Sequence, residues 1–122
     1  MLSEDELEKG LCWGRIVHVE NLPDSSGRWK AGPHFCIILS SNAQIKKSGA
    51  LTVAAISSDK HDIEPVFRVP VPPRWGLSGF VIRSWLPEIH ERQITAFRMV
   101  ALAPEMKPIL EMVRRYREST QS

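Results

Sequence analysis

The sequence predicts a mainly β fold, a small and partly open barrel with one C-terminal α-helix packed against it. Three observations predict it: short apolar runs rich in β-branched residues, turn-rich segments between them, and a change to helical periodicity near residue 104. The length of 122 residues suits one compact domain. We therefore expect a single domain over residues 1–122, with an N-terminal extension at 1–10 and the helix at 104–118.

The expected strands differ in how they should be covered. The run HFCIILSS is almost continuously apolar, which predicts a central strand covered on both faces. VFRVPV alternates and contains Pro70, which is typical of an edge strand. The polar segment NAQIKKSG, residues 42–49, is a predicted turn. The six expected strands are residues 12–20, 34–41, 50–58, 66–71, 80–86 and 92–102.

Two helical segments are expected outside the strands. Near the C-terminus, apolar residues recur at three- and four-residue intervals, which predicts an amphipathic helix with a basic outer face. Pro104 and Pro108 are expected in or near its first turn. At the other end, Ser3 and Glu6 have the spacing of a helical capping box. The apolar positions of the C-terminal helix are Met106, Ile109, Leu110, Val113 and Tyr116.

Composition excludes several classes of protein. A formal net charge of +2 indicates only a mild preference for anions. Cys12 and Cys36 lack metal-binding spacing, so we expect two buried free thiols, with a disulfide between them as the alternative. The sequence shows no signal peptide and no apolar run near the ~20 residues that span a bilayer. We expect a cytoplasmic protein without membrane contact.

The common enzyme motifs are missing. The sequence contains no GxGxxG, P-loop, HExxH or GxSxG motif. Its histidines are scattered without the spacing of metal ligands, so we expect neither a metal nor a cofactor. The four are His18, His34, His61 and His90.

Three features suit chemistry on RNA, and each has a purely structural alternative. Arg28, Trp29 and Lys30 combine two cations with an aromatic ring, as in single-strand binding, and the structural alternative is a solvated turn with Trp29 folded back on the core. Ser57 and Ser58 end a buried strand, where hydroxyls bind either phosphate or turn backbone. His34 begins a strand, where an imidazole either transfers protons or bonds to backbone.

The order of these segments resembles the PemK/MazF toxin family of bacterial toxin–antitoxin systems. GRIVHVE resembles that family's first strand, SSGRWKAGPHFCIILSS its long loop and second strand, and LTVAAISS its third strand. FVIRSWLPEIHERQI and APEMKPILEMVRRY are similar to its later strand and closing helix. The resemblance implies an SH3-like barrel of the PemK/MazF/CcdB type, a homodimer, and metal-free cleavage of single-stranded RNA. It also implies a cognate antitoxin with an acidic, disordered tail.

The resemblance also implies where a catalytic site would lie. The family's usual catalytic arginine falls on His34 and its threonine on Ser57, so both identities differ here. A histidine can accept and donate protons, and serine keeps the hydroxyl of threonine. The leading hypothesis is therefore a toxin-like endoribonuclease with His34 as acid/base and Ser57 on the scissile phosphate. The remaining expected RNA or phosphate contacts are Arg28, Trp29, Lys30, Ser58 and Arg83.

Two alternatives remain at the level of the sequence. Because both catalytic identities differ, the chain could be a catalytically altered homodimer that binds nucleic acid or a protein target without cleavage. A housekeeping SH3-like interaction domain without any nucleic-acid role is the third possibility. For the dimer surface, the edge strand at 66–71 and the stripe of Met106, Ile109 and Val113 are the candidates, unless the stripe packs only on its own barrel.

Overall fold

A computed structural model gives the fold. The structure describes residues 2–20, 22–23, 29–30, 34–47, 49–57, 65–82 and 88–121. The helices are α1 (Glu4–Gly10), α2 (Asn42–Lys47) and α3 (Ala103–Gln121), with 3-10 turns η1 (Pro65–Phe67), η2 (Pro73–Trp75) and η3 (Glu91–Gln93). The strands are β1 (Arg15–Val19), β2 (Leu22–Pro23), β3 (Trp29–Lys30), β4 (His34–Ile38), β5 (Ala50–Ser57), β6 (Arg68–Pro70), β7 (Phe80–Ile82), β8 (Glu88–His90) and β9 (Ile94–Val100).

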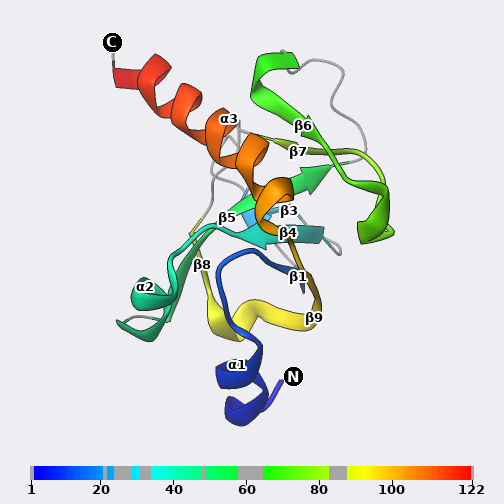
Figure 1. Cartoon of the computed structure of the whole chain (residues 1–122). Coiled ribbons are helices and arrows are strands. Elements are labelled where there is room, and N and C mark those ends of the chain that lie inside the picture. The colour runs from blue at the N-terminus through cyan, green and yellow to red at the C-terminus, as the bar shows by residue number, and fades with distance from the viewer. Residues whose placement is uncertain are drawn as a thin grey trace.

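The main sheet is antiparallel and open. Within the described residues it has seven strands, in the order β6-β7-β5-β4-β1-β9, with β8 paired to the other end of β5. β2 and β3 pair only with each other. Figure 1 shows α3 lying across one face of this sheet, with α1 at the far end of the molecule from the C-terminus of α3. The predicted fold class, mainly β with a C-terminal helix and not fully closed, is confirmed.

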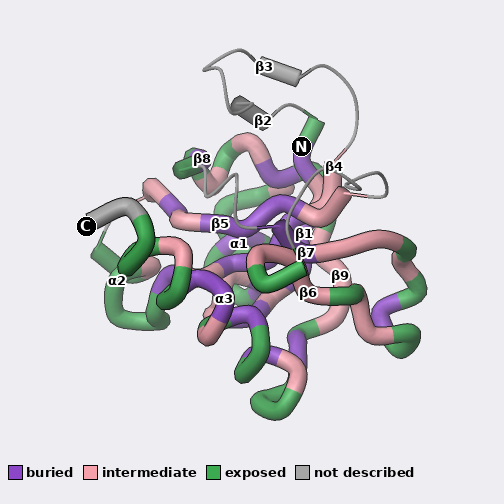
Figure 2. The backbone as a smooth tube through the Cα atoms, turned by 90° about the horizontal axis from the view of Figure 1, so that it is seen from above, coloured by how far each residue is buried: buried purple, intermediate pink, exposed green. Residues whose placement is uncertain are grey.

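β4 is the central strand that its continuous apolar sequence predicts. It lies between β1 and β5, with Cys36 opposite Val17 on one side and Ala55 on the other. Successive side chains of a strand point to opposite faces, so an uninterrupted apolar run requires cover on both. Cys36, Ile37 and Ile38 are accordingly all fully buried. Figure 2 shows the buried segments running through the strands at the middle of the molecule.

Two hydrophobic clusters lie on the two faces of the sheet. The inner-face cluster is built on Val17, Cys36, Val53 and Ala55, and it includes Ile89 from β8 and Leu7 from α1. The α3-face cluster lies under α3 and contains Trp75, which is fully buried. Its members from the sheet and the helix are Ile16, Ile37, Ala54, Val81, Met106, Ile109, Met112 and Val113.

The apolar stripe of α3 packs on its own sheet. Met106 and Ile109 are fully buried and Val113 is 5% exposed within one protomer. These three side chains therefore cannot form a dimer surface, and that candidate was wrong because the helix uses its stripe to cover the α3 face. Pro108 lies inside α3, beyond the first turn that was predicted for it. The helix gives up one backbone hydrogen bond there, to the carbonyl of Pro104.

The first helix closes the end of the inner-face cluster. Its capping box is confirmed, since Ser3 Oγ accepts from the Glu6 amide at 3.1 Å and Glu6 Oε1 accepts from the Ser3 amide at 3.1 Å. The helix ends on Gly10, where a Cβ atom would lie 2.2 Å from Cε2 of the Phe97 ring. Arg15 holds this contact by donating from Nε to the Gly10 carbonyl at 2.9 Å while lying over the Phe97 ring at 5.2 Å.

One predicted turn was wrong. Residues 42–47 form helix α2 rather than a polar turn. Ser41 Oγ accepts from the Gln44 amide at 3.2 Å, and Gln44 Oε1 accepts from the Ser41 amide at 3.1 Å. This is a second capping box, and the spacing of Ser41 and Gln44 in the sequence was the signal for it.

Candidate functional site

The sheet brings His34 and Ser57 together. The register between β4 and β5 pairs Phe35 with Ile56 as its last step, and continuing it by one residue sets His34 opposite Ser57. Both residues still belong to their strands, because His34 pairs with Val19 on β1 and Ser57 with Phe80 on β7. Directly opposed residues of an antiparallel pair have Cβ atoms about 4.5–5.5 Å apart. The two side chains are therefore neighbours on one face.

That face is the one that carries the inner-face cluster. Phe35 and Ile56 pack against the α3-face cluster, so the alternation of the strands turns His34 and Ser57 to the other side. They occupy the middle of a row that crosses the sheet at one end of its strands. From β9 to β6 the row is Ile94, Val19, His34, Ser57, Phe80 and Pro70. The row thus holds a polar pair between apolar neighbours at one end of the sheet.

The two polar residues are partly buried. His34 and Ser57 both have intermediate exposure, and Nε2 of the His34 ring is buried from solvent. An imidazole beside a hydroxyl offers one group that exchanges protons and one that donates a hydrogen bond to an anionic oxygen.

The other sequence-predicted RNA contacts are not placed beside His34 and Ser57 by the described residues. Arg28, Ser58 and Arg83 lie outside the described residues. Trp29 and Lys30 form β3, where Trp29 pairs with Pro23 and Lys30 with Leu22. Their roles stay predictions.

Sequence reasoning missed Arg68. This residue lies on β6 opposite Ile82, two positions from the pair formed by Pro70 and Phe80. Its guanidinium carbon stands 4.8 Å from the centre of the Phe80 ring, and Phe80 is the neighbour of Ser57 in the row. The alternation of VFRVPV was the sequence signal for this residue. It indicates that Arg68 and Pro70 lie on one face of the strand, but it does not identify the residues of the neighbouring strands on that face.

A second polar group lies on the opposite face. The Thr95 hydroxyl donates to the His18 carbonyl at 3.0 Å, and the His18 Nδ1 atom lies 2.6 Å from that hydroxyl. The His18 ring meets Phe35 edge-on at 5.0 Å, and the guanidinium of Arg98 lies 5.3 Å over the same Phe35 ring. Phe35 packs on the α3 face, so this group lies on the opposite side of the sheet from His34 and Ser57.

A cavity of about 830 Å³ lies elsewhere, between α1, α2 and η3. Leu7, Leu11 and Ile45 line its apolar part, and Lys46 and Arg92 its polar part. Its described lining residues include none of the sequence-predicted site residues. In the described part of the chain, no three histidine, cysteine or acidic side chains come together as a metal-binding group. No described helix has the length and apolarity needed to cross a membrane.

The cysteines have separate environments. Both are free thiols, as predicted, but only Cys36 is buried, whereas Cys12 is partly exposed at the cavity of α1 and α2. Burial raises the pKa of the Cys36 thiol to about 12. Because Cys36 is enclosed in the core, its thiol is not accessible as a nucleophile.

Comparison with known proteins assigns the chain to a family. The family model for the PemK-like, MazF-like toxin of type II toxin-antitoxin systems matches residues 13–101. The chain belongs to this PemK/MazF family. The match leaves α1 outside it and ends just before α3. Comparison with curated protein sequences finds no match.

Solved structures with the PemK/MazF fold resemble the chain over most of its length. An endoribonuclease in complex with its cognate antitoxin from a mycobacterial species is 13% identical with a TM-score of 0.71, covering 89% of this chain and 94% of that one. MazE-MazF (Form-III) from Deinococcus radiodurans is 18% identical with a TM-score of 0.69, covering 92% and 97%. At these identities the likeness shows the fold.

Proposed function

We propose that this PemK/MazF-family protein is a toxin endoribonuclease that cleaves single-stranded RNA without a metal ion. The observation that carries the proposal is the juxtaposition of His34 and Ser57 across β4 and β5. Two strands that come from separate parts of the sequence supply an imidazole and a hydroxyl to one site. These residues occupy the positions at which the family resemblance expects the catalytic pair.

The proposed reaction is a transesterification within the RNA. The 2′-hydroxyl attacks the adjacent phosphorus, the bond to the 5′-oxygen breaks, and the products are a 2′,3′-cyclic phosphate and a 5′-hydroxyl. His34 removes the proton from the 2′-hydroxyl and returns a proton to the leaving 5′-oxygen. Ser57 donates a hydrogen bond to a phosphate oxygen as negative charge develops on it. Arg28, Trp29, Lys30, Ser58 and Arg83 are proposed to hold the backbone and stack a base.

The proposal includes control by a partner. Two of the structural relatives are described as complexes with an antitoxin or with MazE. We expect a cognate antitoxin whose acidic, disordered tail occupies the RNA site, because a polyanion competes for a site made for a polyanion. We also expect a cytoplasmic homodimer, whose surface must avoid the buried stripe of α3.

Cleavage of a long single-stranded RNA in the presence of chelator tests the activity. The wild-type protein is expected to produce fragments that end in a 2′,3′-cyclic phosphate, and His34→Ala to produce about 10²–10⁴ times fewer per unit time. Glu8→Ala, an exposed change on α1, is the matched control and should cleave like the wild type. Equal cleavage by His34→Ala and the control would remove His34 from the chemistry.

A non-catalytic toxin fold is the second candidate. The buried Nε2 of His34 and the absence of arginine at its position favour it. In that case the wild type would bind an RNA oligonucleotide, or a protein target, without producing fragments. Growth arrest on expression that persists in His34→Ala would support this candidate over the nuclease.

A further inference from the structure

The cavity between α1, α2 and η3 lies away from His34 and Ser57. Its lining residue Arg92 belongs to η3, which follows directly on His90, and His90 pairs with Ala50 at the start of β5. Ser57 is the last of the eight residues of β5, and a strand rises about 3.3 Å per residue. The cavity is therefore at the other end of the sheet from the proposed RNA site.

The size and floor of the cavity suit a small apolar ligand. Its volume of about 830 Å³ lies within the range of about 300–1,000 Å³ that is usual for ligand sites. Its apolar surface comes from Leu2, Leu7, Leu11 and Ile45. All four belong to the inner-face cluster or pack against it, and all but Leu7 are partly exposed. A ligand that covers this surface removes it from water, which favours binding.

The charged lining residues are divided by sign between the elements. Glu4 and Glu8 lie one turn apart on α1, whereas Lys46 comes from α2 and Arg92 from η3. Glu91, which precedes Arg92, is partly buried and offsets one of the two positive charges. The side of the cavity formed by α2 and η3 thus keeps one net positive charge, and α1 contributes two negative charges.

These charged groups do not neutralise one another. In the described part of the chain, no ion pair or side-chain hydrogen bond holds Lys46, Arg92 or the two α1 carboxylates. Asn42, one turn before Lys46, accepts at Oδ1 from the Trp13 amide at 2.8 Å, so its NH₂ group remains available as a donor in the same lining. Hydrogen-bond donors therefore gather on α2 and η3, and acceptors on α1.

We propose that this cavity binds a short apolar peptide with a free amino terminus and a free carboxyl terminus, a site separate from the proposed function. The carboxylate binds Lys46 and Arg92, the ammonium binds Glu4 and Glu8, and apolar side chains cover the leucine floor. A compact cavity of this volume is about 12 Å across, and an extended chain advances about 3.3–3.6 Å per residue, so three residues span it. A free amino acid carries both charges on one carbon, and a fatty acid lacks the cation that α1 would bind.

Calorimetric titration of the wild type with four tripeptides at pH 7 tests the proposal. Trileucine with free ends should bind most tightly. N-acetyl-trileucine lacks the ammonium and trileucine amide lacks the carboxylate, so each should bind about threefold more weakly. Triglycine keeps both charges but has no apolar side chains, and it should show no measurable binding.

Charge variants identify which side of the cavity each end of the peptide contacts. In Lys46→Ala with Arg92→Ala, trileucine and its amide should bind with similar affinity, because the groups that distinguish a carboxylate from an amide are gone. In Glu4→Gln with Glu8→Gln, trileucine and its acetylated form should bind alike for the same reason. Lys47→Ala is the matched control, since this exposed neighbour of Lys46 on α2 does not belong to the described lining. Circular dichroism and melting temperature establish that each variant is folded.

Cys12 reports where the peptide binds. This thiol lines the cavity and is partly exposed, whereas Cys36 is buried. Iodoacetamide should therefore alkylate Cys12 first. Trileucine at nine times its Kd should slow that reaction about tenfold, because only the free protein reacts. Triglycine at the same concentration should leave the rate unchanged.

The outcomes decide the inference without any measurement on RNA, so they are independent of the proposed function. Absence of trileucine binding at millimolar concentration overturns it, as does binding that leaves the alkylation of Cys12 unchanged and so lies elsewhere. Equal affinity for the free, acetylated and amidated peptides overturns the free-ended peptide and assigns the cavity to an internal apolar segment or another apolar ligand. A preference for free ends that persists in both charge variants overturns the assigned contacts.

Discussion

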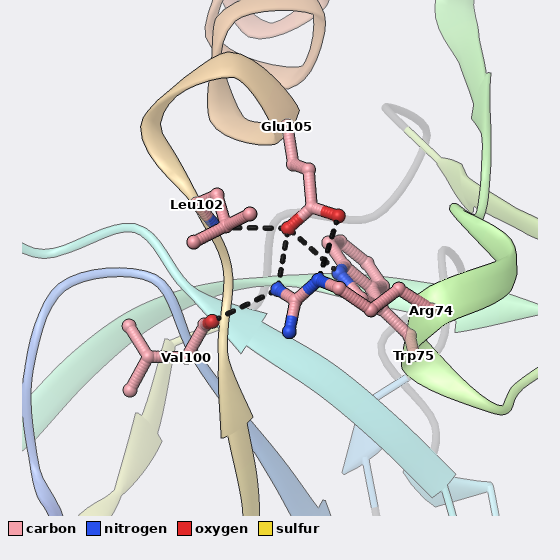
Figure 3. Close-up of polar contacts among 5 residues, drawn as sticks. All are labelled: Arg74, Trp75, Val100, Leu102 and Glu105. Carbon is pink, nitrogen blue, oxygen red and sulfur yellow. Dashed lines mark hydrogen bonds and ion pairs between the residues drawn. The ribbon is translucent and has the colours of Figure 1, made fainter.

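Arg74 donates two hydrogen bonds to the carboxylate of Glu105, from Nη2 to Oε1 at 2.6 Å and from Nε to Oε2 at 3.1 Å (Figure 3). The same carboxylate accepts from the Trp75 indole at 3.2 Å and from the Leu102 amide at 2.8 Å. Arg74 also donates to the Val100 carbonyl at 3.2 Å. This cluster joins η2, the end of β9 and the start of α3, so it fixes the helix that covers the α3 face.

The cluster predicts a loss of stability in acid. The hydrogen bond from Arg74, supported by those from Leu102 and Trp75, lowers the pKa of Glu105 from 4.5 to about 2. A carboxyl whose pKa is lower in the folded state contributes stability above its unfolded pKa and loses it as the pH falls toward the folded value. The wild type should therefore exceed Glu105→Gln in unfolding free energy at pH 7, with the difference shrinking between pH 4.5 and about 2.

Urea denaturation of both proteins at several pH values measures this difference. Glu118→Gln is the matched control, because that carboxylate pairs only with Arg114 on the exposed side of α3 among the described contacts. A difference between wild type and Glu105→Gln that stays constant down to pH 2 would contradict the assigned role of the carboxylate.

Gly10 should tolerate no larger residue. A Cβ atom at this position would lie 2.2 Å from the Phe97 ring, and Phe97 is held by Arg15 and the inner-face cluster. Gly10→Ala should therefore lower the unfolding free energy by about 1–3 kcal/mol, although alanine is the better helix former. The double variant Gly10→Ala with Phe97→Leu should recover part of that loss in thermal melts. If Gly10→Ala alone is neutral or stabilising, the close approach is not a constraint.

The backbone plan of the protein was largely predictable from the sequence. The run HFCIILSS identified the central β4 because only a strand covered on both faces tolerates continuous apolar residues. Ser3 and Glu6 identified the start of α1 through their capping spacing. Both signals depend only on residues close together in the sequence, so they can be recognised without knowledge of the tertiary structure.

The site was less predictable because it depends on register. His34 and Ser57 lie on two strands that are joined through helix α2, and a shift of one residue in register would turn one of them to the other face. The position of Arg68 depends in addition on the strand order, which sets β7 between β6 and β5. The alternation of apolar and polar residues indicates on which face of the sheet a side chain lies. Its neighbours on the adjacent strands are set by the strand order and the register.

The two thiols should differ in reactivity. Burial raises the pKa of Cys36 to about 12, so almost no thiolate forms at pH 8. Cys12 is partly exposed, and we expect it to react with a disulfide reagent such as Ellman's reagent in the native protein. Cys12→Ser should show no rapid thiol titration until urea unfolds the chain. Rapid reaction of this folded variant would mean that the core around Cys36 opens frequently.

His18 should hold its proton on Nδ1. The Thr95 hydroxyl has one proton and gives it to the His18 carbonyl, so the close contact between Nδ1 and that hydroxyl requires the ring to donate. The ¹⁵N shifts of the neutral ring should identify Nδ1 as protonated, and Thr95→Val should weaken that preference. A neutral His18 ring that carries its proton on Nε2 in the wild type would contradict this hydrogen-bond assignment.

Replacing His34 by arginine tests whether this chain needs a proton-transfer group where the family usually has a charge. Under the proposed mechanism an imidazole moves protons, which a guanidinium does poorly because it does not lose its proton in proteins. His34→Arg should therefore cleave about 10²-fold more slowly than wild type near neutral pH, and its rate should lose the dependence on pH that an imidazole confers. Ser57→Thr, which restores the family's hydroxyl residue, should cleave like the wild type, whereas Ser57→Ala should lose about 10²-fold. Rates measured from pH 5 to 9 for these variants decide the matter. If His34→Arg equals or exceeds the wild type at every pH, His34 acts only as a polar contact and the acid/base step belongs to another group.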